Sequence, residues 1–186
     1  MMRRINYGLL AGLGSLVVLF SSTPEPEAPP VPLVEVAWDE TFSLHQQRLH
    51  RHGEPFTGIV TLTHPNGARA EQAAYHEGQR HGMTTRWYAN GQREAERHYT
   101  HGEKTGVHWG WWADGTLQYR YEYANGLHHG RAQEWLADGT PFRDFNYAEG
   151  HESGRQQMWY PDGTLRANYV VQDGRRYGLI GAKPCV

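Results

Sequence analysis

The chain has 186 residues, with 18 Lys and Arg against 20 Asp and Glu and a formal net charge of −2. This balance argues against a nucleic-acid partner, which usually selects a strongly basic surface. An aromatic content of 12% argues against a disordered acidic tail. The 22 glycines, 7 tryptophans and 11 tyrosines favour short strands joined by tight turns.

The first 22 residues have the layout of an export signal. Arg3 and Arg4 precede an apolar stretch at residues 9–20, which is shorter than the about 20 residues of a full membrane span. We expect a signal peptide or an uncleaved signal anchor at 1–22. The protein is then exported, and it is periplasmic or extracellular, or anchored to the membrane by this segment.

A proline-rich segment, residues 23–37, follows the export signal. It contains five of the chain's ten prolines, and such a composition favours extended polyproline II structure. We interpret it as a linker.

A 24-residue period then fills residues 54–173, which we interpret as five repeats between an amino-terminal cap at 38–53 and a carboxy-terminal cap at 174–186. Each unit reads Gly-x-x-x-Gly-x-x-x-x-Trp-x-x-Asn/Asp-Gly and then eight residues that end in Tyr or Val. Three columns keep this step most clearly: Gly58, Gly82, Gly106, Gly130 and Gly154; Trp87, Trp111, Trp135 and Trp159; Tyr75, Tyr99, Tyr123 and Tyr147.

The Asn-Gly and Asp-Gly pairs predict hairpins, because type I′ turns need positive φ at both central residues. A two-residue loop at Asn90-Gly91 places Gly82 opposite Tyr99, and the same rule pairs the glycine with the closing tyrosine in the other units. We expect the bare glycine backbone to seat the tyrosine ring. The prediction is an all-β fold, an elongated array of antiparallel hairpins.

The predicted register also separates two faces of the sheet. Ala95, Tyr121 and Phe145 fall on the face that we expect to be packed. Trp87, Trp111, Trp135 and Trp159 fall on the other face among polar residues, and we call them the Trp stripe. The stripe is the candidate binding surface, and packing between repeats is the alternative role for these side chains.

The unit resembles MORN-type repeats, in the bacterial variant found in YwqK-family antitoxins. The likeness rests on the Gly-x-x-x-Gly spacing, the Trp87-Tyr88 and Trp159-Tyr160 pairs, the Asn/Asp-Gly turn, the closing tyrosine and the entry Pro55-Phe56-Thr57-Gly58. The resemblance implies a hairpin array without catalysis, used for scaffolding or for contacts with membranes. The antitoxin name implies neutralisation of a toxin by binding.

Residues with other chemistry form no recognisable site. His45, His50 and His52 lie close together and His128-His129 are adjacent, but no metal-ligand spacing accompanies them, so we expect loop and surface histidines without metal. Cys185 is the one cysteine, and an interchain disulfide, a redox thiol, a copper ligand and an inert tail residue all remain open for it. No nucleotide, hydrolase or other catalytic motif is present, so we expect neither an enzyme nor a cofactor.

The sequence therefore predicts an exported interaction or scaffold module at the cell envelope with a protein partner. Two alternatives remain: a YwqK-type antitoxin or immunity protein, and a module that binds lipid headgroups or cell-wall carbohydrate.

Overall fold

The computed structural model describes residues 34–181, and all of its regular elements are β-strands. The predicted export signal at 1–22, most of the linker and Cys185 lie outside the described residues. The strands are β1 (Glu35–Ala37), β2 (Phe42–His45), β3 (Arg48–Arg51), β4 (Glu54–Pro55), β5 (Gly58–Thr63), β6 (Arg69–His76), β7 (Gln79–Trp87), β8 (Arg93–Thr100), β9 (Glu103–Trp111), β10 (Leu117–Ala124), β11 (Leu127–Trp135), β12 (Pro141–Ala148), β13 (His151–Glu152), β14 (Gly154–Trp159), β15 (Leu165–Gln172) and β16 (Arg175–Leu179).

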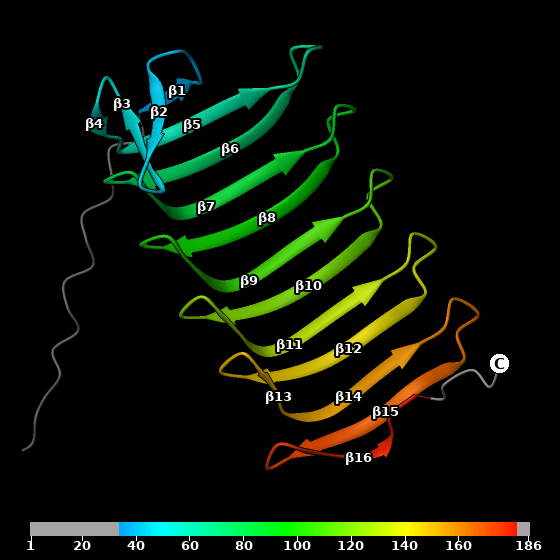
Figure 1. Cartoon of the computed structure of the whole chain (residues 1–186). Coiled ribbons are helices and arrows are strands. Elements are labelled where there is room, and N and C mark those ends of the chain that lie inside the picture. Colours follow the sequence, from blue (N-terminus) through cyan, green and yellow to red (C-terminus); the bar gives the residue numbers. More distant parts are fainter. Residues whose placement is uncertain (1–33, 182–186) are drawn as a thin grey trace, which may run out of the picture. The chain divides into compact units, whose positions relative to one another are not determined.

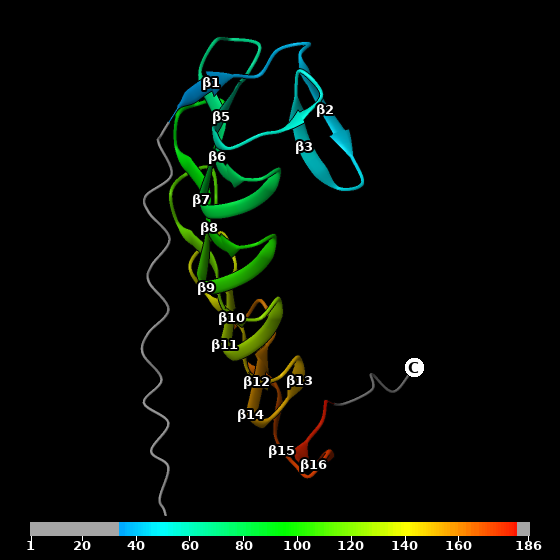
Figure 2. The same cartoon turned by 90° about the vertical axis from the view of Figure 1, so that its left-hand side faces the viewer.

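Thirteen of these strands form one sheet in the order β1-β5-β6-β7-β8-β9-β10-β11-β12-β14-β15-β16, with β13 also paired to β12. From β5 onward, strands that follow each other in the chain pair antiparallel in the sheet, except that β13 and β14 both pair with β12, whereas β1 runs parallel to β5. Figure 1 shows the successive hairpins side by side, and Figure 2 shows the sheet as one layer with curved strands. The predicted all-β hairpin array is confirmed.

The predicted pairing of glycine with tyrosine is also confirmed. Gly58 pairs with Tyr75, Gly82 with Tyr99, and Gly106 with Tyr123. Gly130 pairs with Tyr147 in the same way. In the fifth unit the closing residue is a valine, and Gly154 pairs with this Val171.

The turn type predicted at Asn90-Gly91 is wrong. The Gly91 amide donates to the Tyr88 carbonyl at 2.9 Å, and the Tyr88 amide donates to the Gln92 carbonyl at 2.9 Å. Gly91 has φ of +85°, but Asn90 is not among the described residues with positive φ. This is a type I turn followed by a glycine bulge, and the Asn90 side chain stabilises it by accepting from the Gln92 amide at 3.0 Å.

Type I′ turns occur instead at the connections between repeats. Asn125 and Gly126, with φ of +50° and +77°, join the paired residues Ala124 and Leu127. Positive φ at two successive residues recurs at 77–78, 101–102, 149–150 and 173–174. Glu77, His101 and Glu149 are not the residues usually expected at such a turn, whereas Asn125-Gly126 and Asp173-Gly174 carry the usual type I′ signal, although the prediction places that turn type at the other turn of each repeat.

The role predicted for the glycine column, a seat for the tyrosine ring, is also wrong. Beside Gly106 the pairing shifts from Glu96–Trp109 to His98–Thr105, so the strand bulges there, and Gly106 has φ of +67°. A Cβ on Gly106 would meet only the His98 Cβ, at 3.9 Å, and not the Tyr123 ring. Glycine is needed for the backbone conformation of the bulge. The rest of the column shares positive φ: Gly58, Gly82, Gly130 and Gly154.

A second, three-stranded sheet, β2-β3-β4, packs at the amino-terminal end of the array. Phe42, Leu49, Phe56 and Val60 form a buried cluster that joins it to β5. The Leu49 amide also donates to the carbonyl of Gly78 at 2.8 Å. β2 and β3 lie within the predicted cap at 38–53, and β1 occupies the last three residues of the predicted linker.

The face predicted to be packed holds nearly all of the buried side chains that the structure describes between β5 and β15. Apolar and polar residues contribute: Val60, Ala73, Thr84, Ala95, His108, Ala132, Phe145, Gln156, Ala167 and Tyr169. Thr85, on the opposite face, is also buried. A single layer buries little large apolar volume, so small side chains and hydrogen-bonded polar groups fill the inner positions.

Candidate functional site

The closing tyrosines line up across the strands of the packed face and alternate with residues from the following strand. The Arg80 guanidinium lies between two of them, with Cζ 5.5 Å from the Tyr75 ring centre and 5.7 Å from that of Tyr99. The Lys104 ammonium lies 5.0 Å from the Tyr123 ring centre. The Arg80 contacts link the first repeat to the second, whereas the Lys104 contact lies within the third repeat.

The imidazole of His128 continues this row in the fourth repeat. Its ring centre lies 4.4 Å from that of Tyr123 and 5.1 Å from that of Tyr147. Burial lowers the pKa of His128 and raises the pKa of both tyrosines, so all three rings are neutral at pH 7. The tyrosines are therefore structural elements between repeats.

His108 contradicts the expectation of histidines confined to loops and the surface, because its side chain is 2% exposed. Its Nε2 lies 2.9 Å from the His98 carbonyl, and a carbonyl only accepts, so Nε2 carries the proton. Two repeats later, Gln156 Nε2 donates to the equivalent carbonyl, that of Asn146, at 2.8 Å. Both side chains satisfy a backbone carbonyl beside the glycine bulge.

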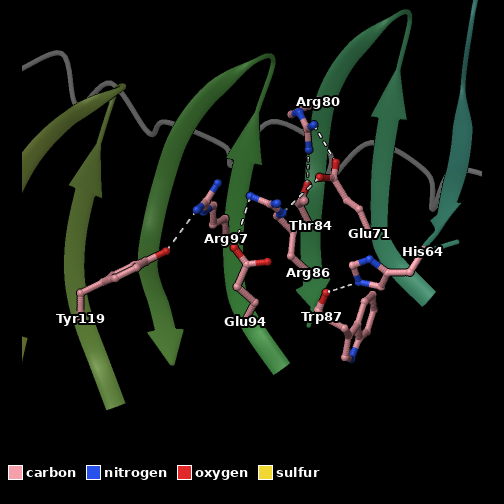
Figure 3. Close-up of polar contacts among 9 residues, drawn as sticks. All are labelled: His64, Glu71, Arg80, Thr84, Arg86, Trp87, Glu94, Arg97 and Tyr119. Atoms are coloured by element: carbon pink, nitrogen blue, oxygen red, sulfur yellow. Dashed lines mark hydrogen bonds and ion pairs between the residues drawn. The ribbon is translucent and has the colours of Figure 1, made fainter. Parts of the chain in front are cut away.

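Ion pairs occupy the packed face of the early repeats (Figure 3). The Arg80 guanidinium lies 2.8 Å from the Glu71 carboxylate and also donates to Thr84 at 3.0 Å. Arg86 lies 3.6 Å from Glu71 and 3.5 Å from Glu94. The sequence pattern predicted the apolar residues of this face but not the charged residues between them, which pair across strands.

All four members of the Trp stripe are half-buried. The Arg69 guanidinium lies over the Trp87 ring at 5.2 Å, and that of Arg93 lies over Trp111 at 5.7 Å. Trp109 adds a further ring on this face and stacks on Trp111 with ring centres 6.5 Å apart. The stripe is thus a row of indoles, two of them covered on one side by arginine from a neighbouring strand.

The backbone of the stripe is held from the preceding repeat. In three units, the residue after the Trp position bonds to the Trp carbonyl one repeat on: His64 to Trp87 at 2.8 Å, Tyr88 to Trp111 at 2.9 Å and Trp112 to Trp135 at 3.3 Å. Figure 3 shows the first of these bonds. This link was not expected from the sequence, although the side chains stand 23 residues before the carbonyls that they bind.

A cavity of about 320 Å³ opens between the β9–β10 and β11–β12 hairpins, beside the Asp-Gly turns. The sequence pattern did not predict it, although the run Trp109-Gly110-Trp111-Trp112 departs from the other units. Eight residues line it: Trp112, Gln118, Tyr119, Tyr121, Glu134, Trp135, Leu136 and Phe142. Trp135 of the stripe is thus the one predicted binding residue at this cavity.

Two kinds of feature, a cluster of metal-ligand side chains and a membrane-spanning helix, are not found in the part of the chain that the structure describes. No group of three or more His, Cys, Asp or Glu side chains is arranged to hold a metal ion among residues 34–181. Within the same residues no helix has the length and apolar character required to cross a membrane.

Comparison with known families gives one match. The MORN repeat variant family matches residues 80–101, which correspond to most of β7 and to β8 with the turn between them. No curated protein matches the chain. The matched hairpin has the same spacing as the other units of residues 54–173. Together, the match and the recurring hairpins support a MORN-type repeat protein, a repeat-based interaction module.

Proposed function

We propose that this protein is an exported, non-catalytic MORN-type module that binds a protein partner at the cell envelope through the Trp stripe. The observation that carries the proposal is the row of half-buried indoles on one face of a single-layer sheet, with Arg69 and Arg93 stacked on two of them. Trp and Arg are the residue types that contribute most to protein interfaces, where they anchor a partner in desolvated contacts.

A non-catalytic role is supported by the surroundings of the carboxylates. Glu71, Glu94, Glu134 and Asp144 each lie within ion-pair distance of arginine on or beside their own hairpin. Their positions fit a structural role in holding strands together.

The test is in-cell crosslinking of the tagged full-length protein in its native host, followed by mass spectrometry of the crosslinked species. We expect one dominant, stoichiometric protein partner. A toxin in that position would identify the YwqK-type antitoxin role. Recovery in a membrane or cell-wall fraction without a protein partner would contradict the proposal and favour binding of lipid or glycan.

Three variants connect the partner to the stripe. Trp111→Ala should abolish the crosslink, and the matched control Trp38→Ala, a tryptophan outside the stripe, should retain it. If Trp111→Ala does not fold, Arg93→Glu tests the stripe in its place. This variant keeps the Trp111 ring and changes a side chain that is 52% exposed, so we expect it to fold. A folded Arg93→Glu protein with an undiminished crosslink would refute the role of the stripe.

Export is tested separately by cell fractionation of the full chain and of a chain without residues 1–22. We expect only the full chain to leave the cytoplasm. Equal distribution of the two proteins would refute export.

A further inference from the structure

The cavity between the β9–β10 and β11–β12 hairpins is made by departures from the repeat. Where Gly110 stands, the other units carry Leu62, Arg86, Glu134 and Met158. A Cβ on Gly110 would overlap the Tyr119 ring, although Gly110 is not among the described residues with positive φ. This glycine therefore makes room for the Tyr119 ring, which occupies the space where a side chain would otherwise stand. The hairpin turn itself does not require glycine at this position, because its φ is not positive.

The aromatic lining is held in fixed orientations. Tyr119 and Tyr121 stack in parallel, with ring centres 4.6 Å apart and an interplanar angle of 15°. The Tyr119 hydroxyl accepts from Arg97 Nη2 at 3.2 Å, and the Trp112 indole donates to the Trp135 carbonyl at 3.3 Å. A lining already held in place loses little conformational entropy when a ligand binds.

One carboxylate lies in this lining. Glu134 Oε1 accepts from the Tyr121 hydroxyl and from Arg143 Nη1, both at 2.9 Å. Both of these bonds end on Oε1, so Oε2 remains an acceptor for a ligand, and the Gln118 amide supplies a donor and an acceptor. Polar groups of this kind fix the orientation of a ligand within an apolar pocket.

The charges around the cavity favour a neutral ligand. Glu134 is the one charged residue among the described lining residues and is already paired with Arg143, while Arg97 donates to the Tyr119 hydroxyl, so a charged ligand finds no unpaired opposite charge in this lining. We propose that this cavity binds a neutral carbohydrate ring. The apolar face of a sugar would pack on the aromatic side chains, and its hydroxyls would bond to Glu134 Oε2 and Gln118. A sugar contains both kinds of surface in one ring.

Trp135 belongs both to the Trp stripe and to the cavity lining, so the variants that test this site, Gly110→Val and Phe142→Ala, lie outside the stripe. The experiment is a titration of the full-length protein with cellotriose, maltotriose and triacetylchitotriose, together with a screen on a glycan array. Trp112 and Trp135 line the cavity, so intrinsic tryptophan fluorescence reports occupancy, and calorimetry measures the affinity.

We expect saturable binding of at least one glycan. Gly110→Val should weaken it by about tenfold or more, because the new side chain displaces Tyr119. The matched control is Tyr160→Ala, which removes the residue equivalent to Trp112 two repeats later and should change the affinity by less than about twofold. Phe142→Ala removes a different lining ring and tests the site if Gly110→Val does not fold.

Three results would overturn the proposal. The first is the lack of saturable binding to every glycan on the array and to all three trisaccharides. The second is binding that folded Gly110→Val or Phe142→Ala leaves unchanged. The third is competition for the cavity by peptides alone, which would make it a contact for the protein partner.

Discussion

Gly106 and Gly110 lie four residues apart on β9, and the structure assigns them different physical roles. Gly106 has φ of +67° with open space where a Cβ would stand, whereas Gly110 has an ordinary φ and lies under the Tyr119 ring. Alanine at Gly106 should therefore cost only backbone strain, about 1–2 kcal/mol. For a protein of this size, that loss corresponds to a fall in Tm of about 2–8 °C. Thermal melts followed by circular dichroism measure it.

Double-mutant cycles separate the two mechanisms. Gly106→Ala and Tyr123→Ala should be additive to within about 0.5 kcal/mol, because the new Cβ does not meet the tyrosine ring. Gly110→Ala and Tyr119→Ala should instead be coupled, since removing the ring relieves the overlap. Strong coupling between Gly106 and Tyr123, with additivity between Gly110 and Tyr119, would refute both roles and restore the idea of a tyrosine seat.

Two further predictions concern pH and the turns. Burial lowers the pKa of His108 and His128, so the unfolded chain binds more protons below its usual histidine pKa of about 6.5, and stability should fall as the pH drops from about 8 towards about 5. His108→Gln, which copies Gln156, should weaken this dependence in melts at several pH values, and an unchanged slope would contradict the assignment. Asn90 Nδ2 donates to the Ala113 carbonyl of the next turn at 2.9 Å, so Asn90→Asp, which removes this donor, should lower stability by about 0.5–1 kcal/mol. Asp114→Asn supplies such a donor at the equivalent position and should raise stability by a smaller amount. Urea unfolding of both variants measures the signs, and a loss in both would refute this link between turns.

The sequence predicted the strand pairing well because the period constrains it strongly. Gly82 opposite Tyr99 follows from the position of Asn90-Gly91, and the pairing is correct although the turn type is not. The glycine bulge after the turn adds a residue, and a second irregularity between Arg86–Ala95 and Trp87–Arg93 compensates for it. The turn residues therefore predicted the wrong turn type although the predicted strand register is correct, since the register also depends on which face is buried.

The charged and polar contacts of the packed face could not be read from the period. Arg80, His108 and Gln156 look like ordinary variation when the units are aligned. Their roles depend on a carbonyl freed by a bulge, or on two rings in neighbouring strands, and these appear only in three dimensions. Hydropathy alone assigned the burial of Ala95 and Phe145 correctly but gave no reason for a buried histidine.

Positions that the units share have structural roles, whereas some positions at which they differ shape a local cavity. The shared glycines and turn residues hold the backbone, so they are needed in every hairpin whatever the protein binds. Gly110 and Tyr119 of the third unit have no counterpart of their kind in the other units, and together with Trp112 and Tyr121 they line or open a single cavity. A single replacement would be compatible with neutral sequence drift. Here, however, Gly110 makes room for the Tyr119 ring, which stacks on Tyr121, and the Tyr121 hydroxyl bonds to Glu134, so the replacements depend on one another. The proposed sugar site therefore lies between β9 and β12, whereas the Trp stripe, the proposed surface for a protein partner, extends along the array.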